Sequence, residues 1–180
     1  MTRRRVVTGH DEQGKSVFIR DEQVEPVTVA LLPGSEFLKV PQGDTTPILP
    51  TDGTEEHSGT FFPPAGGFSF GFVTMPPDTT EGAPADIDLV AALDEMQDKL
   101  AGLMELFEPG HPGTHTSATI DCGMVLAGTP VLELDDGATR QLAPGDTYVQ
   151  SGTRHRRTNP GDVPVVLIAA CIGAVDTGQP

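Results

Sequence analysis

Residues 113–159 read GTHTSATIDCGMVLAGTPVLELDDGATRQLAPGDTYVQSGTRHRRTN, and this stretch decides the fold. His115 and His155 each open a segment with strand-like character. Turn signals lie between them at residues 128–130, 135–137 and 144–146, and a further one follows at residues 159–161. Short strands separated by turns every eight to twelve residues or so are typical of β-sandwiches and jelly-roll barrels. The stretch therefore predicts an all-β core.

Apolar runs outside this stretch predict further strands, at residues 3–7, 16–20, 27–32, 37–40, 67–75 and 165–172. Residues 67–75 alternate strictly, so Phe68, Phe70 and Phe72 are expected on one face of a strand. The run from Val165 to Ile172 is apolar throughout and is expected in the core.

Residues 41–65, from Pro41 to Ala65, hold many Pro, Thr, Gly and Asp residues and little periodicity. This composition predicts a long surface loop that covers a pocket mouth or reaches a partner subunit. His57 lies in its middle and is expected to be a solvated loop histidine.

One amphipathic helix is predicted, from Asp86 to Phe107. Its apolar residues recur at spacings of three and four, which places them on one face: Leu89, Leu93, Met96, Leu100, Leu103, Met104 and Phe107. Asp86 or Asp88 can cap the first turn, and Pro109 with Gly110 ends the helix. The apolar face must cover either the outside of a barrel or a second subunit.

Composition narrows the class of protein. The 180 residues carry a net charge of −15, which argues against a nucleic-acid partner because phosphates repel an acidic surface. No apolar run reaches the roughly 18 residues that a membrane span needs, and the first residues lack the apolar segment of a signal peptide. The two cysteines, Cys122 and Cys171, are expected to be buried thiols in a reducing compartment. We therefore expect a cytoplasmic protein.

The spacing around the two histidines resembles the cupin superfamily, whose motifs are G-x5-H-x-H-x3,4-E-x6-G and G-x5-P-x-G-x2-H-x3-N. Here His115 is followed by Ser117 and Asp121 and then, after six residues, by Gly128; His155 follows Gly152 and precedes Asn159 at the motif spacing. The chain departs from the second motif in two ways, because the interval from Gly145 to Gly152 is one residue short and Gln150 stands where proline is usual. The wider pattern is similar to a bacterial cupin subgroup of mostly unassigned function, in which a TGHD-like start and a helix before the histidine strand are usual.

The resemblance implies one cupin jelly-roll barrel over residues 1–180, with the helix packed outside it. Residues 1–75 would supply N-terminal strands and the long loop, residues 86–107 the helix, and residues 113–173 the barrel core. Cupins commonly pair through their N-terminal strands, so the resemblance also implies a homodimer.

A divalent metal is implied only in part. In metal-binding cupins the two histidines and the glutamate of the first motif, with the histidine of the second, are the ligands. Carried over, His115 and His155 remain, Ser117 replaces one histidine and Asp121 replaces the glutamate. Alternation places His115, Ser117 and Asp121 on one strand face, so two imidazoles and one carboxylate could converge on Fe, Zn, Mn or Ni. The alternative is a metal-free pocket in which these groups are paired polar residues. His111 is a further candidate for the pocket.

Other polar residues near His155 are candidates for substrate contacts. Alternation places Arg157 on the face of His155, where its guanidinium could hold a carboxylate or form an internal salt bridge. Arg154 and Arg156 fall on the opposite face. Tyr148 and Gln150 share a face and could line the pocket.

Three functions follow as hypotheses. The leading one is a small-molecule enzyme, with dioxygenase, isomerase, cyclase and lyase chemistry all left open. In this hypothesis a metal is held by His115, Asp121 and His155. An anionic or phenolic substrate is contacted by Arg157, Tyr148, Gln150 and Ser117. The second is a metal-free binding or sensing module. The third is metal-free acid–base catalysis, with His155 as the base and Asp121 orienting it.

Overall fold

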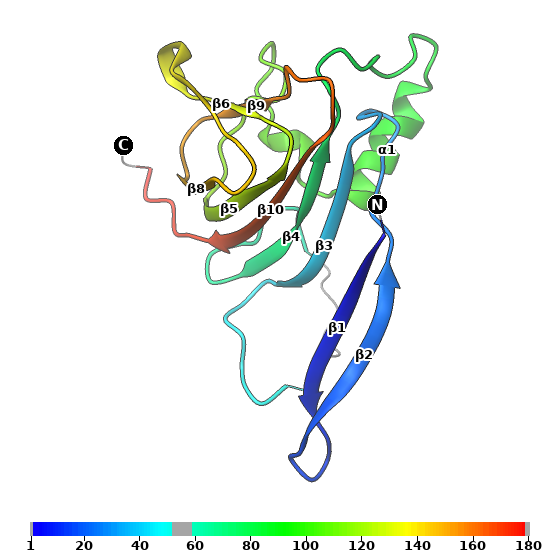
Figure 1. The fold of residues 1–180 in the computed structure, drawn as a ribbon, viewed down its shortest axis with the longest axis vertical. Coiled ribbons are helices and arrows are strands. Elements are labelled where there is room, and N and C mark those ends of the chain that lie inside the picture. The colour runs from blue at the N-terminus through cyan, green and yellow to red at the C-terminus, as the bar shows by residue number, and fades with distance from the viewer. Residues whose placement is uncertain (1, 52–58, 179–180) are drawn as a thin grey trace.

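The computed structural model describes residues 2–51 and 59–178, and its elements are almost all antiparallel strands (Figure 1). The N-terminal half contains β1 (Arg3–His10), β2 (Ser16–Val24), β3 (Glu36–Gly43) and β4 (Phe68–Met75). After the helix come β5 (Thr119–Ala127), β6 (Val131–Glu133), β7 (Thr139–Gln141), β8 (Thr147–Ser151), β9 (Arg156–Thr158) and β10 (Val165–Gly173). The predicted all-β jelly-roll fold is confirmed.

The strands form three sheets. A five-stranded sheet has the order β3-β4-β10-β5-β8, and a three-stranded sheet has the order β7-β6-β9. The third sheet is the hairpin β1-β2, which extends away from the other two (Figure 1). An antiparallel bridge between His115 and His155 lies outside the named strands and joins the start of the β5 segment to the start of the β9 segment.

The helical segment is shorter than predicted. Helix α1 runs from Leu89 to Lys99, and a 3₁₀ turn η1 (Met104–Leu106) follows it. The helix begins at Asp88, whose carboxylate accepts the N–H of Ala91 at 3.1 Å. It ends because Leu100 leaves the helical conformation and Gly102 has a φ of 79°, a left-handed value that suits glycine. The expected helix from Asp86 to Phe107 is therefore wrong at both ends.

The helix packs outside the barrel through only part of its apolar face. Met96 is completely buried, and Leu100 and Leu103 lie with it in a cluster that includes Val29 and Phe37. Three other residues predicted for this face are exposed: Leu89, Leu93 and Met104. Within the described residues, no helix combines the length and the hydropathy that crossing a bilayer requires.

Three further predictions need correction. Residues 27–32 form no strand, because only Val27 pairs, in an isolated bridge to Phe37. The predicted loop at residues 41–65 begins late, since β3 continues to Gly43. Cys122 is exposed rather than buried, while Cys171 is half-buried. His57 lies outside the described residues.

Candidate functional site

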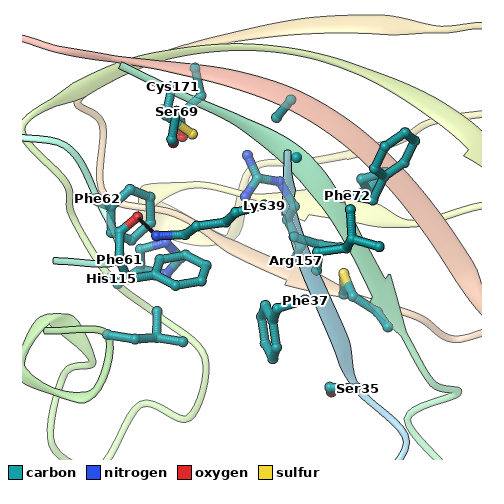
Figure 2. Close-up of a pocket in the computed structure, with 18 of the residues that line it drawn as sticks. Ser35, Phe37, Lys39, Phe61, Phe62, Ser69, Phe72, His115, Arg157 and Cys171 are labelled. Carbon is teal, nitrogen blue, oxygen red and sulfur yellow. Dashed lines mark hydrogen bonds between the residues drawn. The ribbon is translucent and has the colours of Figure 1, made fainter. Parts of the chain in front are cut away.

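A cavity of about 220 Å³ lies against the inner face of the five-stranded sheet. Its walls are largely apolar, with contributions from β3, β4, β10 and the segments around α1: Phe37, Phe61, Phe62, Val73, Met75, Leu103, Phe107, Leu167 and Ala169. Polar side chains enter it from six places in the chain: Lys39, Ser69, His115, Asp121, Arg157 and Cys171, with Tyr148 beside them. Figure 2 shows several of these side chains around the cavity. Such an apolar pocket with few polar groups is typical of a small-molecule site.

The two histidines lie together because their backbones exchange hydrogen bonds, each of 3.0 Å between N and O. Their ring centroids are 4.3 Å apart. The Nδ1 of His115 faces the Gly113 carbonyl at 3.1 Å, and the Nδ1 of His155 faces the Thr153 carbonyl at 2.9 Å. Since a carbonyl only accepts, each Nδ1 carries the proton and each Nε2 presents a lone pair.

Both imidazoles are neutral near pH 7. Burial lowers the pKa of His115, and the nearby Arg157 charge adds to this effect. For His155, which is only 1% exposed, burial and the Arg157 charge lower the pKa to about 3. The Nε2 of His155 is buried without a hydrogen-bond partner among the described residues, and His155 is not part of the cavity lining. It therefore lies behind His115.

Asp121 is a buried carboxylate on the inner face of β5. It is 4% exposed, and its Oδ1 has no partner among the described residues. It lies opposite Cys171 of β10, whose thiol pKa is raised to about 12 by burial and by the Asp121 charge. Ser117 is also buried and bonds to Thr119, with 2.8 Å between the two hydroxyl oxygens. The predicted inward face of Ser117 and Asp121 is confirmed.

The three arginines next to His155 have different partners. Arg154 pairs with Glu108 at 2.6 Å and Asp135 at 2.9 Å, and Arg156 pairs with Glu133 at 2.6 Å. Arg157 lines the cavity, and within the described residues it forms no ion pair. The predicted alternation of these side chains is therefore correct, and the internal salt bridge considered for Arg157 is absent from this part of the chain.

Arg157 is held by uncharged neighbours. Its Cζ lies 4.8 Å from the centroid of the Tyr148 ring, and its Nη2 donates to the side-chain Oε1 of Gln150 at 3.3 Å. Gln150 is 3% exposed and also bonds to Thr153. Burial raises the pKa of Tyr148, so its hydroxyl stays protonated. The two residues thus share the inner face as predicted, with Tyr148 at the cavity and Gln150 supporting Arg157.

The donor set does not fit a divalent metal held by three protein ligands. Among the described residues, no group of three or more His, Cys, Asp and Glu side chains could hold a metal ion. The two predicted imidazoles meet, but among the described residues neither Asp121 nor another His, Cys, Asp or Glu side chain completes a metal site with them. Ser117 uses its hydroxyl on Thr119. The Arg157 charge close to both histidines also disfavours a cation there.

Two other predicted roles differ from the structure. His155 is not oriented by Asp121, because its Nδ1 faces the Thr153 carbonyl. His111 is exposed and lies in a separate surface depression with Arg154 and Glu133. Motif spacing did not place Lys39, Phe61 and Cys171 in the cavity, where the structure has them. The one available signal for Lys39 was a single charge inside the apolar run at residues 37–40.

Comparison with known proteins identifies the family of the domain. Residues 103–171 match the family model of the cupin domain. The Oryzines biosynthesis cluster protein J of Aspergillus oryzae is 33% identical over 90 residues, which cover 43% of this chain and 50% of that protein. The chain thus spans half the length of this curated relative.

Solved structures of low identity are similar in part. KdgF from Halomonas sp. is 14% identical, with a TM-score of 0.44 over 82% of this chain and 87% of that one. A cupin domain from Bordetella pertussis is 20% identical, with a TM-score of 0.36 over 59% and 82%. The DMSP lyase DddQ from Ruegeria pomeroyi is 19% identical, with a TM-score of 0.37 over 61% and 40%. The family match identifies residues 103–171 as a cupin domain.

Proposed function

We propose that the cavity binds a small organic anion with an apolar body, through the protein's own side chains and without a resident metal ion. One observation carries this proposal: Arg157 enters an apolar cavity and has no ion pair among the described residues. A charge removed from water is costly unless it is paired, so a guanidinium in this position favours an anionic ligand. A carboxylate matches its planar set of donors.

The walls define the rest of the ligand. Phe37, Phe61, Phe62 and Phe107 surround the cavity, and burying apolar surface against them adds about 25 cal/mol per Å². A dry engineered cavity of about 150 Å³ binds benzene. The cavity of about 220 Å³ therefore suits one ring with a carboxylate. An anionic ligand of this kind agrees with the anionic small molecule that the sequence predicts. A phenolic group is the second expected chemistry, and the Nε2 lone pair of His115, which lines the cavity, is an acceptor that suits a hydroxyl donor.

Calorimetry with benzoate and benzyl alcohol tests the proposal. Benzoate should bind the wild-type chain, and Arg157→Gln should weaken it at least tenfold while leaving the weak binding of benzyl alcohol unchanged. Arg154→Gln is the matched control, because it removes the same charge from an arginine that pairs with Glu108 outside the cavity. EDTA should leave benzoate binding unchanged. Equal affinities of wild type and Arg157→Gln for benzoate would contradict the proposal.

A divalent-metal enzyme is the second candidate, favoured by the orientation of the two histidines. Each Nδ1 donates to a backbone carbonyl, an arrangement that commonly orients imidazole ligands through Nε2. The chain would supply two imidazoles as metal ligands, and the remaining coordination positions of the metal would be filled by ligands other than the side chains discussed above. Elemental analysis separates the candidates: near-stoichiometric Fe, Zn, Mn or Ni that is lost in both His115→Ala and His155→Ala supports the metal enzyme. Less than about one-tenth equivalent after reloading supports the metal-free site.

We also propose that the chain forms a homodimer through the outer face of the five-stranded sheet. Ile120, Met124, Val149 and Ile172 are exposed there, at 41%, 38%, 68% and 50%. The register places them on neighbouring strands, since Ile172 pairs with Ile120 and Val149 with Cys122. A contiguous exposed apolar patch is typical of a protein interface.

A further inference from the structure

Lys39 is the second cation of the cavity. It lies on the inner side of β3, next to the buried Leu38, and its side chain runs along the cavity wall (Figure 2). Its Nζ donates to the Phe61 carbonyl at 2.6 Å and lies 3.5 Å from the Thr60 carbonyl. The same nitrogen is 4.4 Å from the centroid of the Phe61 ring. The amine is thus held at a fixed place within an apolar site.

The partners of Lys39 are all uncharged. Within the described residues it forms no ion pair, whereas Lys99 pairs with Glu95 at 2.6 Å and Lys15 is exposed. This difference matters because a carboxylate would hold the ammonium form, while a carbonyl accepts an N–H equally from a neutral amine. A neutral amine donating to Phe61 keeps its lone pair for the cavity.

Burial favours the neutral amine further. It lowers the pKa of Lys39 to about 8, although the nearby Cys171 on β10 and Asp44 after β3 act in the opposite direction. Near pH 8 about half of the Lys39 side chains are therefore nucleophilic amines. Exposed lysines, with a pKa near 10.4, hold roughly 0.4% of that form at this pH. Desolvated lysines of this kind react with carbonyl groups.

We propose that Lys39 condenses with a carbonyl group of the bound ligand, so that the cavity accepts an apolar oxo acid whose carboxylate pairs with Arg157. The carboxylate part rests on the proposed function. The Lys39 part stands on the position of the amine alone. Lys39 and Arg157 line the same cavity (Figure 2), so one ligand can contact both cations.

The chemical step balances without an oxidant or reductant. The Nζ lone pair attacks the carbonyl carbon, and the π electrons move to the oxygen to give a carbinolamine. Both amine hydrogens then leave with that oxygen as water, and a C=N bond forms. Protonation of the imine restores a positive nitrogen, which the Phe61 ring and carbonyl stabilise at the place where they hold the amine.

Reductive trapping tests the inference. The wild-type chain is incubated at pH 7.5 with phenylglyoxylate or benzaldehyde and sodium cyanoborohydride, and adducts are located by peptide mass mapping. The chain has only three lysines, Lys15, Lys39 and Lys99, so each is followed separately. Adducts should form on Lys39 at least tenfold faster than on Lys15 or Lys99. The rate at Lys39 should rise with pH through about 8 and then level off.

Variants distinguish this inference from the proposed function. Lys39→Arg should abolish the cavity adduct, and Lys99→Arg should retain it. Arg157→Gln should slow trapping of phenylglyoxylate and leave trapping of benzaldehyde unchanged. If Lys39 is labelled preferentially and Arg157→Gln does not change its rate, imine formation at Lys39 is supported but the pairing of the ligand carboxylate with Arg157 is overturned. Equal labelling of the three lysines in the wild type, with Arg157-dependent benzoate binding intact, would overturn the Lys39 inference alone. The wild-type mapping needs no variant to fold.

Discussion

Both faces of the five-stranded sheet carry residues of a kind that is unusual for that side of a barrel. On the inner face, Ser69, Thr119, Asp121 and Gln150 are polar and at most 6% exposed. On the outer face, Val149 and Ile172 are apolar and at least half exposed. Polar groups generally lie toward water and apolar groups toward the core. The inner face thus has polar residues where apolar ones are usual, and the outer face has apolar residues where polar ones are usual.

Both departures have a free-energy cost, and each indicates a missing contact. A buried polar atom without a partner, such as Asp121 Oδ1, costs about 1–3 kcal/mol. An exposed apolar patch loses the free energy that its burial would give. A ligand with polar groups would reduce the first cost, and a second protein surface the second. Under the two proposals, small-molecule binding would offset the cost at the inner face and dimerisation the cost at the outer face.

The largest effect is expected from charges on the outer face. The double variant Met124→Glu and Val149→Glu should weaken dimerisation at least about 100-fold, because two unpaired carboxylates would enter an apolar interface. The control is Thr139→Glu with Gln141→Glu, which adds the same charge to exposed positions of β7 in the other sheet. Light scattering after gel filtration measures the mass. A wild-type chain that stays monomeric at about 100 µM would refute the dimer proposal.

Two adjacent residues of β5 compare the faces directly. Val125 is completely buried on the inner side, whereas Leu126 is 41% exposed on the outer side. Val125→Ala should lower the free energy of unfolding by about 2 kcal/mol, because it leaves a cavity among Val165 and Leu167. Leu126→Ala removes more atoms but should cost less than about 1 kcal/mol. Urea unfolding of the two variants gives both values, and equal losses would contradict the assigned faces.

The buried His155 predicts a pH dependence of stability. Its folded pKa of about 3 lies below the value of about 6.5 for an unfolded histidine, so the unfolded chain binds the proton first. The stabilisation is therefore complete above pH 6.5 and is lost as pH falls toward 3. Between pH 7 and 5 the loss from this residue should be about 2 kcal/mol.

Urea unfolding at several pH values between 7 and 5 tests this dependence, with His155→Gln as the variant. The pKa of His115 is also lowered by burial, so His115→Gln should remove a further part of the slope. Glu95 and Glu108 have lowered pKa values too, and their contribution falls mainly below this window. His10→Gln is the control, since His10 is exposed on the hairpin. An unchanged slope in His155→Gln would show that folding does not shift the pKa of this imidazole and would contradict the prediction.

Sequence patterns predicted which residues are buried better than they predicted the backbone. Alternation gave β4 and the single face of Phe68, Phe70 and Phe72 correctly, because a strand links spacing and face directly. The spacing of apolar residues also marked Leu100 and Leu103 as buried, and they are. The spacing could not show that Leu100 and Leu103 lie beyond the end of α1, because the turn after the helix places them in the same cluster as Met96.

The site was predictable only where motif spacing or strand alternation applies. The pair His115 and His155, and the inward Arg157, followed from motif spacing and alternation. Lys39, Phe61 and Cys171 meet this group only through the order of strands in the sheet. No spacing rule connects residues so far apart in the chain. The pairing of Asp121 with Cys171 across β5 and β10 depends on the same strand order.

The smallest effect concerns the part of the outer face that the chain covers itself. Leu38 is 4% exposed there, and the Cζ of Arg3 on β1 lies 4.0 Å from the centroid of the Phe72 ring on β4. Arg3→Ala should therefore cost about 0.5–1 kcal/mol and speed amide exchange in β1. Arg4→Ala is the control on the same strand, because Arg4 is exposed and pairs only with Asp21 of the hairpin. If the two variants exchange alike, the hairpin does not use Phe72. If the amides of β1 exchange faster only in Arg3→Ala, the contact between β1 and Phe72 is what separates the covered part of the outer face from the open part.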